Sequence, residues 1–233
     1  MYPASFLHQD ALLPQASPQM MDAAWSRGWR HFGEHFFRYS HSLAEDGSWQ
    51  HILPLRLAVA DFQPTARLRR ILRRNADLTV EIAPARVDAA REALFLRHRQ
   101  RFHSNIPDSL SQFLPSADPA NLPCECREIR LLDQGQLLAV SYLDLGHEAC
   151  SSLYALFEPA AARRSLGFCT LLHEIAFARH SGRRFLYPGY ATAEPSHYDY
   201  KKSFPALQAY CWTTGQWLPL AHISTPPAPP HLP

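Results

Sequence analysis

The chain has 233 residues and a formal net charge of +2, and 46% of its residues are hydrophobic while only 19% are charged. This much apolar surface can offset the entropy lost on folding, so a disordered chain is excluded. Five cysteines are too few for a disulfide scaffold. No apolar run approaches the roughly 20 residues of a membrane helix, and the start lacks a signal-peptide pattern. We therefore expect a cytoplasmic protein that does not bind a membrane.

Hydrophobic periodicity predicts a mixed α/β fold, because alternating apolar residues indicate strands and apolar residues three or four apart indicate helices. Strands are expected at residues 52–62, 78–82, 126–132, 136–145, 151–157 and 185–190, and helices at 84–102 and about 160–180. The basic segment RLRRILRRN after the first strand fits either type. Asp133-Gln134-Gly135 predicts a hairpin turn. Pro159 and Ser181-Gly182 mark the ends of the long helix.

Both ends of the chain are expected to be loose. Residues 1–20 lack periodicity, and the last ten residues hold five of the 20 prolines. Between these tails we expect an N-terminal lobe at 21–105 and a second domain at 106–220, followed by a Pro-rich tail at 221–233.

Arginine dominates the positive charge. Of the 23 basic residues 21 are Arg, and the segment 56–101 holds 11 Arg against 5 acidic residues. Arginine suits phosphate and carboxylate groups. The segment therefore predicts either a footprint for a polyanion or an ordinary solvated basic face.

Familiar catalytic motifs are missing from the sequence. There is no nucleophile elbow, P-loop, HExxH or GxGxxG. Cys124-x-Cys126 is the one close cysteine pair, and a single CxC is weak evidence for zinc. We interpret these cysteines as packing residues and expect no metal.

The start of the long helix is a candidate phosphate site. Arg163, Arg164 and Gly167 lie there, and free amides at a helix start favour anions. The spacing of Arg164, Gly167 and Cys169 resembles the pyrophosphate-binding R/Q-x-x-G-x-G/A signature of GNAT-fold acyltransferases. An ordinary helix start with an incidental glycine remains the alternative.

Several separated motifs occur in a characteristic order. SSLYALFEP, ARRSLG, LYPGY and YKKSF resemble the patterns S-x-x-Y-x-x-F-D-P, A-R-R-S-L-G, L-Y-x-G-Y and Y-K-x-x-F of the arginyl- and leucyl-tRNA protein transferases. Upstream, SRGWRHFGEHFFRY and RLAVADFQPTARLRRILRRN are also similar to that family. The resemblance covers about residues 25–217. It implies a GNAT-like mixed sheet flanked by helices, with the transferase domain at 106–220.

The chain also departs from the family pattern. The stretch YSHSLAEDGSWQHILPLR contains no Cys, whereas the family has there a Cys cluster linked to metal or iron–sulfur binding. We therefore expect neither metal nor cofactor. Glu158 stands where Asp is usual, Pro188 interrupts the LYxGY element, and PALQ follows the YKxxF element in place of R-P-x-E. These changes concern the acceptor side more than the donor side.

The resemblance implies an enzyme that moves an amino acid, with arginine favoured and leucine possible, from charged tRNA to an amine. The acceptor would be a protein, a peptide or a small molecule. The tRNA ester is already activated, so catalysis reduces to positioning the amine and handling its proton. The Arg-rich segment would hold the tRNA backbone. A non-catalytic relative that binds tRNA or peptide and an acyl-CoA-dependent N-acyltransferase are the alternatives.

The resemblance also implies roles for single residues. Arg163, Arg164 and Gly167 would hold the terminal adenosine and its phosphates. Tyr187, Gly189 and Tyr190 would line the cleft for the aminoacyl ester. Tyr200 and Lys201 would orient the ester or stabilise the oxyanion.

The remaining candidates are charged residues outside those two groups. Glu158 and Asp144 would grip a cationic donor side chain or accept the amine proton, although an acid before a helix-opening Pro is often a cap. Arg30 and Arg56 would receive an acceptor carboxylate, with salt bridging as the alternative.

Overall fold

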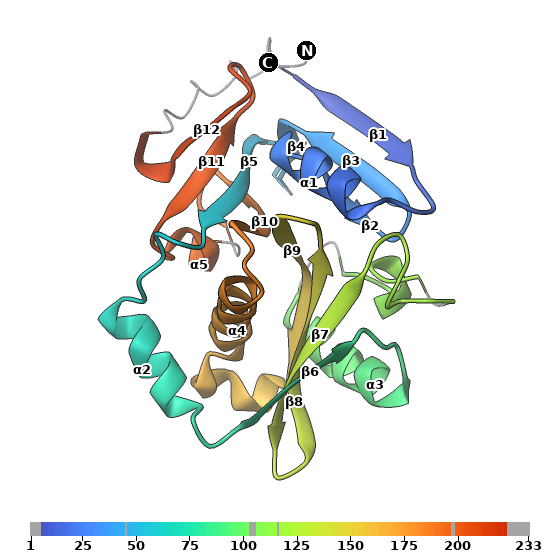
Figure 1. The fold of residues 1–233 in the computed structure, drawn as a ribbon, viewed down its shortest axis with the longest axis vertical. Helices are drawn as coiled ribbons and strands as arrows, with labels where there is room; N and C mark the ends of the chain where they lie inside the picture. Colours follow the sequence, from blue (N-terminus) through green and yellow to red (C-terminus); the bar gives the residue numbers. More distant parts are fainter. Residues whose placement is uncertain (1–5, 45, 103–105, 116, 197–198, 223–233) are drawn as a thin grey trace.

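The computed structural model describes residues 6–44, 46–102, 106–115, 117–196 and 199–222. A large sheet runs through the molecule (Figure 1). Its strands in spatial order are β12 (Gln216–Pro219), β11 (Leu207–Cys211), β5 (Trp49–Ala58), β10 (Phe185–Thr192), β9 (Ala149–Phe157), β8 (Gln136–Leu145), β7 (Cys126–Asp133) and β6 (Thr79–Pro84). The short β4 (His41–Leu43) also pairs with β5.

The topology confirms the expected mixed α/β, GNAT-like fold. Among the strand pairs of the described residues, β9 and β10 alone are parallel, and α4 (Leu166–His180) lies between them in the chain. The neighbouring pairs in this sheet are antiparallel. The predicted hairpin is confirmed, because Gln134 and Gly135 both have positive φ between β7 and β8.

Helices cover both faces of the sheet. Successive side chains of a strand point to opposite faces, so Leu143 of β8 packs in one core with Leu172 of α4. Its neighbour Tyr142 packs in a second core with Phe95 of α3 (Ala89–His98). A further helix, α2 (Ala66–Arg74), contacts α4.

The ambiguous basic segment forms α2. Thr65 caps its start by accepting a hydrogen bond from the Leu68 amide at 3.3 Å, and Leu68 and Ile71 are buried. The arginines of this helix are exposed. The apolar residues therefore dock the helix, and its charges remain in solvent.

The expectation of a loose segment at residues 1–20 was wrong for residues 8–20, whereas residues 1–5 lie outside the described residues. Residues His8–Leu12 form β1, which joins β3 (His35–Tyr39) and β2 (Arg30–Phe32) in a small sheet. The helix α1 (Pro18–Ser26) is capped by Ser17 and buries Met21 and Trp25. Trp25 packs against Tyr187 of β10, which is why this segment is ordered.

The large sheet crosses the expected boundary near residue 105. Its strands β5 and β6 precede that point, whereas β7 to β12 follow it. The C-terminal tail expected at 221–233 lies almost wholly outside the described residues, which end at residue 222.

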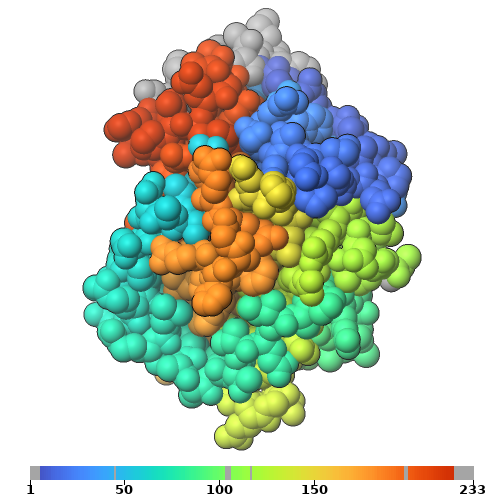
Figure 2. All heavy atoms as spheres, in the orientation of Figure 1, coloured from blue at the N-terminus to red at the C-terminus, as the bar shows by residue number. Residues whose placement is uncertain are grey.

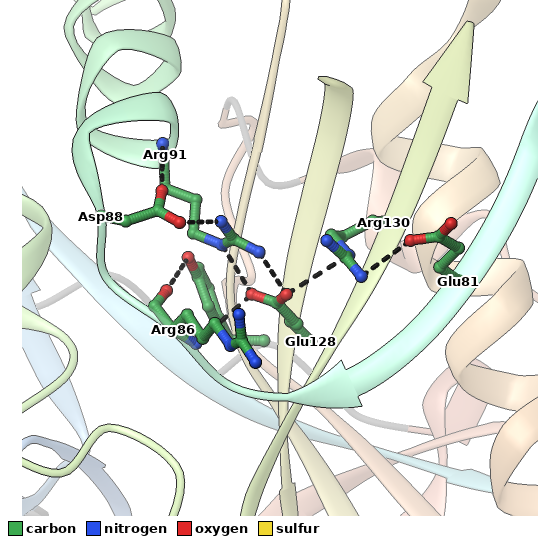
Figure 3. Close-up of polar contacts among 7 residues, drawn as sticks. Glu81, Arg86, Asp88, Arg91, Glu128 and Arg130 are labelled. Carbon is green, nitrogen blue, oxygen red and sulfur yellow. Dashed lines mark hydrogen bonds and ion pairs between the residues drawn. The ribbon is translucent and has the colours of Figure 1, made fainter. Parts of the chain in front are cut away.

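A buried ion network fastens α3 to the sheet (Figure 3). Arg91 donates to Glu128 of β7, with Nε 2.7 Å from Oε2, and its guanidinium also pairs with Asp88. Glu128 is fully buried. Removing Arg91 would leave the buried charge of Glu128 unpaired, so Arg91 has a structural role. Arg91 is therefore not part of a polyanion footprint.

The long helix is interrupted at its start. Residues Pro159–Arg164 form a 3-10 turn, Ser165 adopts a left-handed conformation with φ +58°, and α4 begins at Leu166. The end of α2 supports this break, because the Asn75 amide donates to the Arg164 carbonyl at 2.9 Å. Pro159 and Gly182 flank the helical segment as predicted.

Candidate functional site

The two parallel strands separate shortly after they meet. β9 and β10 pair over residues 149–151 and 185–187, and the register of β10 against β5 then shifts between Leu186 and Gly189. Pro188 lies at this shift and has no amide hydrogen to donate. We call the region bounded by Ser152, Leu153, Gly189 and Tyr190 the strand opening. Ligands of α/β sheets commonly bind where neighbouring strands diverge.

Arg30 of β2 spans the strand opening. Its guanidinium donates to the Ser152 carbonyl at 3.2 Å and to the Leu153 carbonyl at 3.1 Å. It also lies 5.9 Å from the ring centre of Tyr190. Arg30 therefore satisfies carbonyl groups of β9 and brings a positive charge to the opening.

Gly189 lets two cations approach the backbone of β10. Its φ is +97°, and a Cβ there would overlap Nη1 of Arg30 and lie 3.1 Å from Nζ of Lys201. Both the backbone conformation and the space thus require glycine.

Lys201 comes to the same place from α5 (Asp199–Lys202). Its Nζ donates to the Tyr190 carbonyl at 3.3 Å. The pKa of Lys201 is lowered to about 7, mainly by burial and then by the charge of Arg30, whereas Glu174 opposes the shift. Near neutral pH the amine is therefore divided between its charged and neutral forms.

Glu174 of α4 lies beneath the opening with 1% of its surface exposed. Burial raises its pKa to about 7. Oε1 accepts a hydrogen bond from Ser152 Oγ at 3.3 Å, and Oε2 has no hydrogen-bond partner among the described residues. A carboxyl and an amine that both titrate near pH 7 can accept and donate protons.

Sequence reasoning missed Glu174 and Ser152. A signal for Glu174 was available, because it shares the apolar face of α4 with Leu171, Ile175 and Ala178. An acid among buried residues is exceptional. For Ser152 no comparable pattern exists.

An aromatic pocket adjoins the opening. It is narrow, with a free volume of about 10 Å³. That volume holds about one water molecule, so a larger group enters only when lining side chains move. Its lining contains no acid and consists of Trp25, Gly28, Trp29, Arg30, Pro54, Leu55, Ser151, Tyr187, Gly189, Tyr190 and Trp217.

A second pocket of about 240 Å³ shares Tyr187 with the aromatic pocket. Asp22, Glu148 and Arg56 bring charges of both signs to its lining. The Arg56 guanidinium stacks 4.1 Å from the ring centre of Phe185 and donates to Gln208. Burial lowers the pKa of Arg56 and raises that of Tyr187 to about 12.

The helix start forms a separate basic region beside α2. Arg164 forms a bidentate ion pair with Asp77, in which the two guanidinium nitrogens lie 2.8 and 2.9 Å from the two carboxylate oxygens. Arg74 donates a hydrogen bond to the Arg163 carbonyl. The α2 segment and the chain around α4 lie on the same face of the molecule (Figure 2). A Cβ at Gly167 would meet only the ring of Phe157, at 3.4 Å. Gly167 is thus not needed for local packing.

The structure divides the predicted site residues. Arg30, Gly189, Tyr190 and Lys201 meet at the strand opening, and Tyr187 lines both pockets. The ring of Tyr200 packs 5.4 Å from that of Phe168 at the start of α4, so Tyr200 lies between the helix start and the opening.

Two acids are not where the predicted roles need them. Asp144 is 2% exposed and hydrogen-bonded to His31, so it cannot grip a donor side chain in this arrangement. Glu158 makes an ion pair with Arg97 at 2.7 Å and forms no side-chain cap. Arg30 binds main-chain carbonyls, which differs from both of its predicted roles.

Comparison with known proteins identifies related sequences. The family model described as "Arginine-tRNA-protein transferase, C terminus" matches residues 90–211. An aspartate/glutamate leucyltransferase of Xylella fastidiosa is 36% identical over 69% of this chain and 67% of its own length. A protein of the same name from Chromohalobacter salexigens is 32% identical over 84% of this chain and 79% of its own.

Solved structures show more distant likeness. FemX has a TM-score of 0.47 at 10% identity and is matched over 83% of this chain and 65% of its own. A C-terminal domain of a putative lysylphosphatidylglycerol synthetase from Agrobacterium fabrum has a TM-score of 0.44 at 18% identity, over 60% and 46%. Such values carry no functional conclusion. No helix of the described residues is long and apolar enough to cross a membrane.

Proposed function

Because this chain belongs to the arginine-tRNA-protein transferase family of aminoacyl-tRNA-dependent enzymes, we propose that it transfers leucine from charged tRNA to the α-amine of a protein that begins with Asp or Glu. The proposed donor and acceptor rest on the similarity to an aspartate/glutamate leucyltransferase over 84% of the chain. The proposed donor amino acid is therefore leucine and not arginine, the donor that the sequence analysis favoured. The reaction would occur in the cytoplasm, where charged tRNA is found.

The aromatic pocket supports a leucyl donor. Its lining includes Trp25, Leu55 and Trp217 and no carboxylate. A buried arginyl side chain would need an acid to pair with, whereas a leucyl side chain gains free energy from apolar contact alone. The donor side chain would enter after lining residues move, since the pocket is narrow.

The strand opening supports the transfer chemistry. The attacking amine forms a C–N bond with the ester carbonyl carbon, and the C–O bond to the terminal ribose breaks. Glu174, as carboxylate, is suited to receive the proton that the amine loses and to return it to the ribose oxygen, directly or through Ser152. Lys201 and Arg30, as cations, would stabilise the oxyanion that forms on the carbonyl oxygen.

The basic surface of α2 and the helix start support tRNA binding. The arginines at 67, 69, 70, 73 and 74 are exposed, and Arg163 and Arg164 adjoin the end of that helix. Phosphate contacts of this kind depend on charge and not on base sequence. The tRNA backbone would follow α2, with its 3′ end directed past Tyr200 into the strand opening.

The second pocket supports recognition of an acidic N-terminal residue. Arg56 would bind the side-chain carboxylate of the acceptor. Asp22 and Glu148 would attract its ammonium group, although both Asp22 oxygens already accept main-chain hydrogen bonds. Tyr187 borders this pocket and the aromatic pocket, so the amine would reach the ester beside it.

The decisive experiment compares donors and acceptors with the purified chain. Leu-tRNA and Arg-tRNA are each offered with two peptides that differ only in an N-terminal Asp or Asn. We expect leucine to be transferred to the Asp peptide and little transfer to the Asn peptide, which lacks the charge. Arginine transfer in place of leucine would overturn the donor assignment. Absence of transfer from either tRNA, with tRNA binding retained, would identify a non-catalytic relative, and acylation with acyl-CoA alone would identify the other alternative.

A further inference from the structure

Three potential metal ligands from different segments meet in the interior behind Arg30. They are His31 of β2, Cys124 just before β7 and Asp144 of β8. One ligand atom of each lies within 4.8 Å of the other two. Their exposed fractions are 2%, 4% and 2%. The three segments are far apart in sequence, so the cluster exists only in the folded chain.

The surroundings of His31 favour a cation between its ring and Asp144. Nδ1 lies 3.0 Å from the Gly33 carbonyl oxygen, which only accepts, so Nδ1 carries a proton. Nε2 lies 3.0 Å from Asp144 Oδ2. In the neutral ring the lone pair of Nε2 therefore faces a carboxylate, and a proton or a metal ion must lie between them. Metal-binding histidines typically donate their second N–H to a backbone carbonyl in this way.

Cys124 adds a sulfur ligand. Its thiol is free and buried, and its Sγ lies within 4.8 Å of the ligand atoms of His31 and Asp144. A cation at this position would stabilise the thiolate form. Nitrogen and thiolate ligands with one carboxylate suit Zn²⁺ and not Mg²⁺ or Ca²⁺.

We propose that His31, Cys124 and Asp144 bind a zinc ion. On binding, the Cys124 thiol releases its proton to solvent. Zn²⁺, one thiolate, one carboxylate and a neutral imidazole then sum to zero charge, which suits a buried site. In a tetrahedral zinc site the ligand atoms are about 3.2 to 3.8 Å apart. A separation of 4.8 Å, the upper bound in the cluster, would have to shorten by about 1 Å, whereas the 3.0 Å between His31 Nε2 and Asp144 Oδ2 would have to lengthen slightly.

The position of the cluster gives the ion a structural role. It would join β2 to the segment before β7 and to β8, and so connect the small N-terminal sheet with the large one. His31 is the neighbour of Arg30, which spans the strand opening. Zinc would therefore hold Arg30 against β9 without touching a substrate. This site differs from the sequence expectation of no metal, which rested on the lone CxC pair and on the missing Cys cluster of the family pattern.

The test measures metal content and not activity. Untagged full-length protein is purified under reducing conditions, dialysed against a weak chelator and analysed for metals. We expect about one zinc per chain in the wild type and in Cys169→Ser, which alters a buried thiol of α4 away from the cluster. Cys124→Ser and His31→Gln should lose most of the zinc and melt at lower temperature. Equal zinc content in all four proteins would overturn the site.

Cobalt binding covers the case in which the variants fail to fold. Wild-type protein freed of metal by a strong chelator is titrated with Co²⁺ and followed by absorption. We expect one equivalent to bind with an intense thiolate-to-cobalt charge-transfer band and to raise the melting temperature. Wild-type protein that carries no zinc and shows no such band would overturn the proposal.

Discussion

Residues of the strand opening and of the helix start were both predicted from family motifs, yet the charged side chains of the two regions differ in their exposure to solvent. At the helix start Arg164 is partly exposed and neutralised by Asp77, and the arginines of α2 face solvent. At the strand opening Glu174 is buried and Lys201 is half-buried, and the pKa of each is shifted to about 7.

This difference separates binding from chemistry. An exposed ion pair contributes only about 0 to 1 kcal/mol, so Arg164 can exchange Asp77 for a phosphate at little cost in stability. The Lys201 amine and the Glu174 carboxyl instead change protonation near neutral pH, as proton transfer requires. We therefore expect changes at the opening to affect turnover and changes at the helix start to affect tRNA affinity.

The largest expected effect is on turnover in Glu174→Gln. General acid–base groups typically contribute about 10²- to 10⁴-fold, so we expect kcat to fall by about 100-fold or more. The exposed Glu34→Gln serves as control. Transfer assays under single-turnover conditions measure the loss, and a wild-type rate in Glu174→Gln would remove this residue from the chemistry.

The pKa values of Glu174 and Lys201 predict a bell-shaped dependence of activity on pH. Glu174 must be ionised, so activity falls as pH drops below its pKa of about 7. Lys201 must be charged, so activity also falls as pH rises above its pKa of about 7. The two apparent values belong to the coupled pair. Lys201→Arg, which stays charged, should lose the alkaline limb, and an unchanged limb would contradict the role of Lys201.

The next largest effect is expected for Gly189→Ala. Its Cβ would displace Arg30 and Lys201, and an error of about 1 Å in position can cost about 100-fold in rate. Gly182→Ala is the matched control, because Gly182 also has a positive φ but open space around it. Comparable losses of activity in both variants would mean that backbone strain, and not displacement of the cations, is responsible.

A smaller effect is expected on tRNA affinity when Arg70 and Arg73 of α2 become Gln. Each phosphate contact contributes about 0.9 to the slope of log K against log salt, so the slope should fall by about 2. Arg127 and Arg184, on other surfaces, provide the control pair. Filter binding at several salt concentrations measures the slope, and an equal change in both pairs would mean that α2 holds no special footprint.

The smallest effect is expected for Arg164→Ala. Loss of one charge-assisted phosphate contact of roughly 1.5 kcal/mol should weaken tRNA use by about tenfold, with the melting temperature nearly unchanged. Asp77→Asn is the informative partner, because it releases Arg164 and should leave tRNA binding equal or tighter. Weaker binding in Asp77→Asn would show that the ion pair itself shapes the helix start.

Local elements were predictable because their signals are local. Apart from Glu128, the strand β7 is apolar at its most buried positions, β8 is an apolar-rich run that is buried over most of its length, and the turn at Gln134-Gly135 has the positive φ values that a tight hairpin favours. Residues 8–26 were missed because their order depends on Trp25 packing against Tyr187, a contact between distant segments.

The sequence by itself determined the α/β fold class, the family and the residue types at the helix start, since each is carried by motifs or periodicity within short segments. Only the tertiary structure decided which of those residues meet. Arg30 reaches the Ser152 carbonyl across 122 positions, and His31 reaches Asp144 across 113. Burial likewise sets the protonation of Lys201 and Glu174. Distance and desolvation arise from packing, so no pattern along the chain encodes them directly.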